Sequence, residues 1–132
     1  MSYMGTRELL EFEKELKDLM ERSNDGAVIV VEGFRDRESL RLLGIRGRIV
    51  ESSSSPSDIL AEEICRITKD VIIFTDSDRS GISLQRRLVR AFECRGIKPD
   101  VKTGKKMLSL CKVNNVELLA LRYYKSLEFV KF

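Results

Sequence analysis

The sequence predicts one α/β domain over residues 1–132, with a central, mostly parallel four-stranded sheet and helices on both faces. Two observations favour this class. Residues 27–31 and 71–75 are short runs rich in β-branched and apolar side chains, as expected for strands covered on both faces. Helical patterns alternate with these strand patterns along the chain. We expect an N-terminal helix in residues 1–25, the sheet with the functional site in 26–102, and C-terminal helices in 103–132.

The first predicted helix is amphipathic, because apolar residues recur at helical spacing over residues 9–20. It should end at the turn signal of residues 24–26. The first strand, at residues 27–31, should be followed by a short helix that Asp36 caps and Gly44 ends.

A short second strand at residues 49–50 precedes the next helix. Ser55 and Pro56 form a favourable helix start, with serine as the cap and proline in the first turn. The expected inner face of this helix consists of Ile59, Leu60, Ile64 and Ile67. The run at residues 71–75 is the strongest strand pattern in the sequence.

Three more helices and one edge strand complete the predicted pattern. The helix that begins near residue 81 should end at Gly96 and turn Leu84, Leu88, Ala91 and Phe92 inward. Residues 99–101 would form the fourth strand, at an edge of the sheet, where Pro99 is tolerated. A short helix at residues 107–111 is followed by one that Asn114 opens, with Glu117 completing a capping box.

Composition excludes several kinds of chemistry. The sequence has no histidine, which removes Ser-His-Asp triads, His-ligated zinc and His-based proton transfer. Cys65, Cys94 and Cys111 are odd in number and widely spaced, so we expect reduced, buried thiols. The net charge of +3 is too small for nucleic-acid binding by overall charge, so any such binding must be local. No apolar run approaches the roughly 20 residues that span a bilayer, and we expect a cytoplasmic protein without membrane contact.

Acidic residues follow two of the predicted strands directly. Glu32 ends the first strand, and Asp76 and Asp78 follow the third. In a parallel sheet of order 2-1-3-4, Glu32 and Asp76 would hang from adjacent strands about 4.8 Å apart. Carboxylates that converge there need a cation, and hard oxygen ligands favour Mg²⁺ or Mn²⁺. Gly33 and Gly81 beside these acids would allow tight turns and leave room for a phosphate.

Two motifs carry a resemblance to a known family. Val-Glu-Gly ends the first strand, and Thr-Asp-Ser-Asp-Arg-Ser-Gly ends another about forty residues later. Over residues 28–45 and 71–88 the chain resembles the Toprim family, the catalytic domain of type IA and type II topoisomerases, bacterial primases, certain nucleases and a ribonuclease that matures 5S ribosomal RNA. In length and layout it is similar to small archaeal Toprim proteins. The resemblance implies a Rossmann-like three-layer sandwich.

The resemblance also implies roles for individual residues. It makes Glu32 the general acid or base and a metal ligand, and it makes Asp76 and Asp78 the Mg²⁺ pair. Asp36 matches an acid common in nuclease and primase members, although a plain helix cap explains it equally well. Arg79 would hold a phosphate or simply balance the neighbouring carboxylates, and Gly33 and Gly81 would support the phosphate.

The sequence also departs from the topoisomerase pattern. Ser80 and Ile82 stand where topoisomerases often carry further acids, which argues against strand passage with two metal ions. Cleavage through a tyrosine would need another domain to carry it, and Tyr123 and Tyr124 lie in a predicted helix, where packing explains them. Primase activity would need template and nucleotide sites for which the chain has little room.

Further basic residues could extend a nucleic-acid surface. Arg35 and Arg37 flank the first acidic turn and could hold phosphates. A second group forms one stripe that is either a solvated face or a nucleic-acid track; it consists of Arg86, Arg87, Arg90, Lys102, Lys105 and Lys106.

The leading hypothesis is therefore Mg²⁺-dependent hydrolysis of phosphodiester bonds in structured RNA or DNA. The main alternative is a non-catalytic module that uses the same metal to dock on nucleic acid or on a larger complex. A third interpretation is a phospho-receiver or aspartyl-phosphatase domain, although its acids would follow a different pattern. The apolar side of the first helix and residues 130–132 could pack internally or serve a homodimer.

Overall fold

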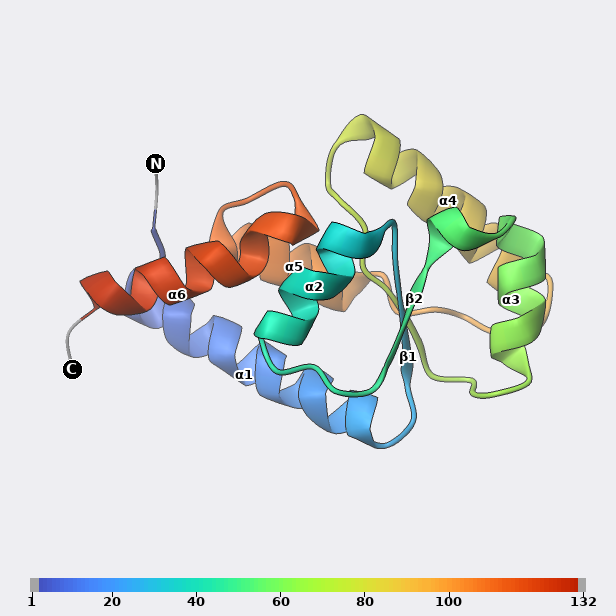
Figure 1. The fold of residues 1–132 in the computed structure, drawn as a ribbon, viewed down its shortest axis with the longest axis horizontal. Coiled ribbons are helices and arrows are strands. Elements are labelled where there is room, and N and C mark those ends of the chain that lie inside the picture. The colour runs from blue at the N-terminus through green and yellow to red at the C-terminus, as the bar shows by residue number, and fades with distance from the viewer. Residues whose placement is uncertain (1–2, 131–132) are drawn as a thin grey trace.

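A computed structural model describes residues 3–130 of the chain, so residues 131 and 132 of the predicted dimer contact lie outside the described part (Figure 1). The elements in chain order are α1 (Thr6–Asn24), β1 (Val28–Val31), α2 (Phe34–Leu42), β2 (Arg48–Glu51), η1 (Ser52–Ser54), α3 (Ser57–Cys65), β3 (Val71–Ile73), α4 (Arg79–Glu93), α5 (Lys102–Cys111), η2 (Val116–Leu118) and α6 (Leu119–Phe129). None of the helices within residues 3–130 is long and apolar enough to cross a membrane.

The described sheet has three parallel strands in the order β2-β1-β3, with Val30 level with Val50 on one side and with Ile73 on the other. The prediction of a fourth strand is wrong. Residues 99–101 contribute only one parallel bridge, between Asp100 and Ile72.

The reason for the missing strand lies in the Asp100 side chain. Its Oδ1 accepts hydrogen bonds from the amides of Lys102 (2.8 Å) and Thr103 (3.0 Å), the first residues of α5. Because this cap starts a helix at once, the chain turns away from the sheet after a single bridged residue. The helix predicted at residues 107–111 consequently begins five residues earlier, at Lys102.

Helices cover both faces of the sheet. Val28 and Val30 pack in a cluster with side chains of α3 and α4, whereas Ile29 and Val31 pack in a second cluster with α1, α2, α5 and α6. In Figure 1 the pair α3 and α4 lies on one side of the strands and the remaining helices on the other. This two-sided burial explains why β1 is apolar at every position.

Some side chains lie elsewhere than the sequence pattern predicts. On α3 the buried residues are Leu60, Ala61 and Ile64, whereas Ile59 and Ile67 are about half exposed. All three cysteines are free thiols, as expected, and Cys111 is buried. Cys94, however, is exposed at the end of α4.

Candidate functional site

The predicted acids lie at the carboxyl end of the sheet. Glu32 follows β1 directly, and its exposed carboxylate accepts no hydrogen bond from residues 3–130. The amide of Phe74 donates to the carbonyl of Val30 (2.8 Å), which continues the pairing of β1 and β3 beyond the last strand residue. Asp76 therefore lies two residues beyond Phe74, next to the strand β1 that Glu32 follows.

The carboxylate of Asp76 is held by the segment between α5 and α6. Its Oδ1 accepts from the amide of Val116 (2.8 Å), and its Oδ2 accepts from Nδ2 of Asn115 (3.1 Å). The amide of Ser77 also donates to the carbonyl of Asn114 (2.9 Å). The turn after β3 is thus fixed by a segment about forty residues further along the chain.

This arrangement explains why the predicted capping box at Asn114 is wrong. The side chain of Asn114 accepts from the Ser77 hydroxyl (3.0 Å) and caps no helix. The segment forms the short η2 turn first, and Asp76 binds the free amide of Val116 at its start, as a capping residue would.

Asp78 has a structural role at the start of α4. It is the N-cap residue, and its Oδ1 accepts from the amide of Gly81 (2.8 Å). The carboxylate is exposed, and its second oxygen accepts no hydrogen bond from residues 3–130. Asp78 therefore keeps one oxygen free for a ligand while it stabilises the helix.

Gly33 and Gly81 differ in how much space surrounds them. Gly33 has an extended backbone (φ −150°) that any residue adopts, and a Cβ added there would meet no atom within 4 Å. Gly81 lies within α4, where a Cβ would overlap the backbone carbonyl of Asp76. Unusual backbone angles are needed at neither position. Gly81 instead allows α4 to approach the turn after β3, and Gly33 leaves open space beside Glu32.

Asp36 lies at the centre of the acidic group. It is only 7% exposed, and its Oδ2 accepts from the amide of Gly33 (3.2 Å), so the capping role is present even though α2 begins two residues before it. Burial, aided by the negative charges of Asp76, Glu32 and Glu117, raises the pKa of Asp36 to about 6, against the lowering effect of that hydrogen bond. These acids are thus close enough to oppose the ionisation of Asp36.

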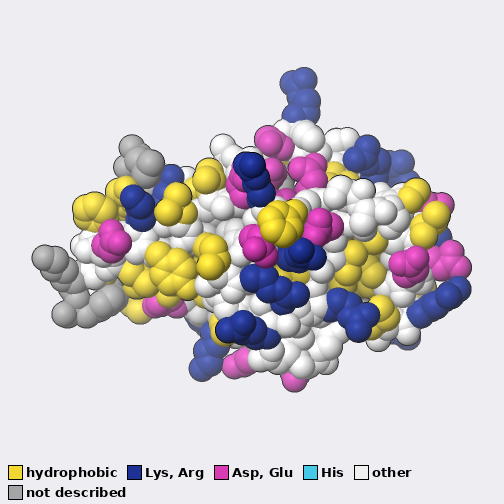
Figure 2. All heavy atoms as spheres, in the orientation of Figure 1, with side chains coloured by type: hydrophobic (Ala, Val, Ile, Leu, Met, Phe, Trp, Pro, Cys, Tyr) yellow, Lys and Arg dark blue, Asp and Glu magenta, His cyan; other side chains and the backbone are white. Residues whose placement is uncertain are grey.

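Basic residues surround this group unevenly. Arg37 forms an ion pair with Glu51 (2.9 Å) at the end of β2, and Arg35 lies 3.9 Å from Glu117. Arg79, at the start of α4, is exposed and forms no ion pair within residues 3–130. Figure 2 shows acidic side chains over the first turn of α2, and Lys and Arg side chains along the edge where Figure 1 places α4.

A divalent cation fits the chemistry of this site. Within residues 3–130 no three Asp, Glu or Cys side chains converge as a preformed cage, but Mg²⁺ commonly binds through one or two carboxylates and several waters. The Thr75 hydroxyl, 6% exposed and next to Asp76, has no hydrogen-bond partner in the described part of the chain. An unpaired buried hydroxyl is costly unless a water or a ligand forms a hydrogen bond with it.

Four residues at the site escaped the sequence analysis. They are Phe34, Thr75, Asn115 and Glu117. Phe34 is 57% exposed. In the sequence it directly follows the Glu-Gly pair, and an aromatic residue beside a predicted acidic turn is a signal that could have marked it as part of the site. Asn115 and Glu117 carry no local signal, because only the folded chain brings them to Asp76 and Asp36.

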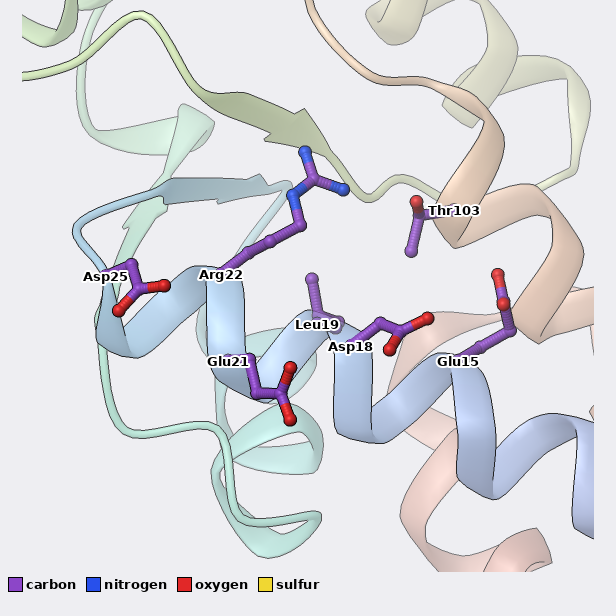
Figure 3. A pocket seen from close by; sticks show the side chains of 7 residues that line it. All are labelled: Glu15, Asp18, Leu19, Glu21, Arg22, Asp25 and Thr103. Atoms are coloured by element: carbon purple, nitrogen blue, oxygen red, sulfur yellow. The ribbon is translucent and has the colours of Figure 1, made fainter.

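A separate hollow of about 400 Å³ lies at the opposite end of the sheet (Figure 3). Four acidic residues line it together with Leu19, Thr103 and Arg22. Arg22 extends from α1 toward β3 and forms ion pairs with Asp70 (2.6 Å) and Asp100 (2.7 Å). Burial raises the pKa of Asp100, but the hydrogen bonds from Arg22 and Thr103 outweigh it and hold the pKa at about 2. These contacts join α1, β3 and α5, so we assign this hollow a structural role.

A family model described as Toprim domain matches residues 26–102. The chain belongs to the Toprim family. The matched region of this Toprim protein contains both acidic motifs, and Glu117 lies outside it.

Relatives of this Toprim protein include three archaeal UPF0292 proteins. That of Archaeoglobus fulgidus is 36% identical over 118 residues, which cover 86% of this chain and 90% of the relative. That of Methanosarcina barkeri is 36% identical over 115 residues, covering 86% and 80%. That of Methanocaldococcus jannaschii is 40% identical over 95 residues, covering 71% of each chain. The predicted similarity to small archaeal Toprim proteins is confirmed.

The fold of this Toprim protein also has a solved counterpart. A protein from Aquifex aeolicus superposes with a TM-score of 0.70 at 21% identity, over 80% of this chain and 94% of that chain. The likeness supports a parallel sheet flanked by helices. Family membership itself indicates a metal-dependent function related to nucleic acids.

Proposed function

We propose that this Toprim protein hydrolyses phosphodiester bonds in structured RNA or DNA with the help of Mg²⁺. The observation that supports the proposal is the position of Glu32, Asp76 and Asp78, which follow the neighbouring strands β1 and β3 at the carboxyl end of the sheet, with Glu32 and Asp78 exposed to solvent. A cation there would relieve the repulsion between these carboxylates.

Each acid has a role in this proposal. Asp76 and Asp78 would hold the ion, because each leaves an acceptor position after its hydrogen bonds to the protein. When bound, Mg²⁺ polarises a phosphate and makes water a stronger acid. Glu32, whose carboxylate accepts no hydrogen bond from residues 3–130, would take the proton from the attacking water. Arg79 would contact a phosphate oxygen from the start of α4.

The decisive variant is Asp76→Asn. Asparagine keeps an oxygen for the amide of Val116, and the Asn115 amide can rotate to offer its own oxygen, so we expect the fold to persist. Cleavage of structured RNA and DNA with Mg²⁺ should fall by at least a hundredfold, read on a denaturing gel. Asp18→Asn, at an exposed acid of α1, is the matched control and should keep full activity. Equal rates for the parent and Asp76→Asn would end the hydrolytic proposal.

Two observations favour a second candidate, a metal-dependent binding module without turnover. Both oxygens of Asp76 already accept hydrogen bonds, and Ser80 and Ile82 stand where topoisomerases often carry acids. Such a module would bind labelled nucleic acid more tightly with Mg²⁺ than with a chelator, and it would release no product. Any product that depends on Asp76 would exclude it.

A further inference from the structure

Phe34 is an exposed aromatic residue at the entrance of the acidic site. It begins α2 directly after Glu32 and Gly33, and 57% of it is exposed. Burial of a phenylalanine side chain in an apolar core strongly stabilises a fold. More than half of Phe34 stays outside the two apolar cores that lie on either side of the sheet.

The ring is positioned by a charged neighbour. The guanidinium carbon of Arg37 lies 5.4 Å from the ring centroid, within the range of a cation–π contact. The ion pair of Arg37 with Glu51 (2.9 Å) links this guanidinium to the end of β2. The Phe34 ring therefore lies against a guanidinium that is fixed by an ion pair, and it is next to the open space beside Gly33.

The surroundings of Phe34 suit a charged ligand with an aromatic group. Its sequence neighbours Glu32 and Arg35 are exposed and charged, and Figure 2 shows hydrophobic, acidic and basic side chains intermingled over the start of α2. An apolar protein partner would require a continuous apolar patch. A nucleobase brings a flat π surface together with the phosphate that a metal at the acids would attract.

We propose that Phe34 stacks on an unpaired nucleobase next to the phosphate held at the acids, so that the protein prefers single-stranded or looped nucleic acid to duplex. This inference rests on the proposed use of nucleic acid at the same site. In a duplex each base is already stacked between neighbours, and the ring can reach it only after unstacking, which costs a few kcal/mol. Stacking on an aromatic side chain contributes about 1–3 kcal/mol per base.

The test uses the absence of tryptophan from the chain. Phe34→Trp introduces a single indole fluorophore at the proposed platform, and Phe129→Trp places one at a site on α6 that is 67% exposed. Each variant is titrated with a twelve-residue oligo(dT) or oligo(U) and with a blunt duplex, in Ca²⁺ to supply a divalent cation with little turnover. We expect the single strands to quench the indole fluorescence of Phe34→Trp strongly and the duplex to quench it weakly. Neither ligand should affect the fluorescence of Phe129→Trp.

Binding affinity gives a second measurement. Phe34→Leu keeps the apolar bulk but removes the π surface, and it should weaken binding of the single strand by about 5- to 100-fold, measured by fluorescence anisotropy, with the duplex affinity unchanged. Absence of quenching in Phe34→Trp, or equal quenching by strand and duplex, overturns the inference. Quenching in a protein that never cleaves overturns the hydrolytic proposal alone, whereas cleavage without quenching overturns the stacking proposal alone.

Discussion

Asp36 shows how one buried carboxyl group makes stability depend on pH. Its pKa is raised from an ordinary value of 3.8 to about 6, so the folded protein holds this proton more tightly than the unfolded chain does. The stabilisation from the shift is fully present below about pH 4 and is lost as pH rises through 6. At neutral pH the ionised Asp36 destabilises the fold.

We therefore predict that Asp36→Asn stabilises the protein at pH 7–8 by up to about 3 kcal/mol, the equivalent of a two-unit shift. Asparagine can still accept the Gly33 amide, so the helix start is preserved. Near pH 4 the variant and the parent should be equally stable. Urea unfolding in the absence of metal at pH 4, 6 and 8 tests this. A stability difference that stays constant with pH would contradict the explanation.

At the scale of elements, the site depends on how closely α4 approaches the end of β3. Gly81→Ala improves helix propensity by up to about 1 kcal/mol, but the new methyl group would overlap the carbonyl of Asp76. We predict a net loss of about 1–3 kcal/mol in the free energy of unfolding, measured in urea. Gly33→Ala is the matched control, and it should cost less than about 1 kcal/mol because its Cβ meets open space. Equal effects of the two substitutions would contradict this account of Gly81.

Elements with local signals could be predicted from the sequence, and elements that depend on distant contacts could not. The strands β1 and β3 were predictable because their runs are continuously apolar. The edge strand and the Asn114 cap were predicted wrongly, because the Asp100 carboxylate starts α5 and Asp76 takes the amide at Val116. Because Glu32 and Asp76 directly follow predicted strands, the sequence was enough to predict that both lie at one edge of the sheet. No local pattern could reveal that the charge of Glu117, outside the matched domain, helps to raise the pKa of Asp36.

At the scale of the whole molecule, a net charge of +3 gives little general attraction for nucleic acid. If the protein binds nucleic acid as proposed, the attraction must come from one surface. We expect α4 to provide it with Arg86, Arg87 and Arg90, which are exposed and form no ion pair within residues 3–130. The helix begins at Arg79, directly after Asp78, so its later basic residues extend away from the acids.

We predict that replacing these three arginines with glutamine weakens binding of every nucleic acid tested. The slope of log affinity against log salt concentration should become less negative by up to about two to three, because up to three fewer counterions are released on binding. Anisotropy titrations between 50 and 200 mM salt measure the slope. The same triple change at Lys14, Lys17 and Arg7 of α1 should leave the slope unchanged, and an equal loss there would argue for unspecific attraction instead.

The hydrogen bonds from Val116 and Asn115 to Asp76 have a practical consequence for anyone who trims this protein. A fragment limited to residues 26–102 would retain both acidic motifs, yet it would strip Asp76 of both its donors and uncover the sheet face that α1, α5 and α6 protect. The Asp76 carboxylate of such a fragment would be free to rotate in solvent. Activity or metal binding measured on this fragment would therefore report on an Asp76 carboxylate without the hydrogen bonds that it has in the intact protein.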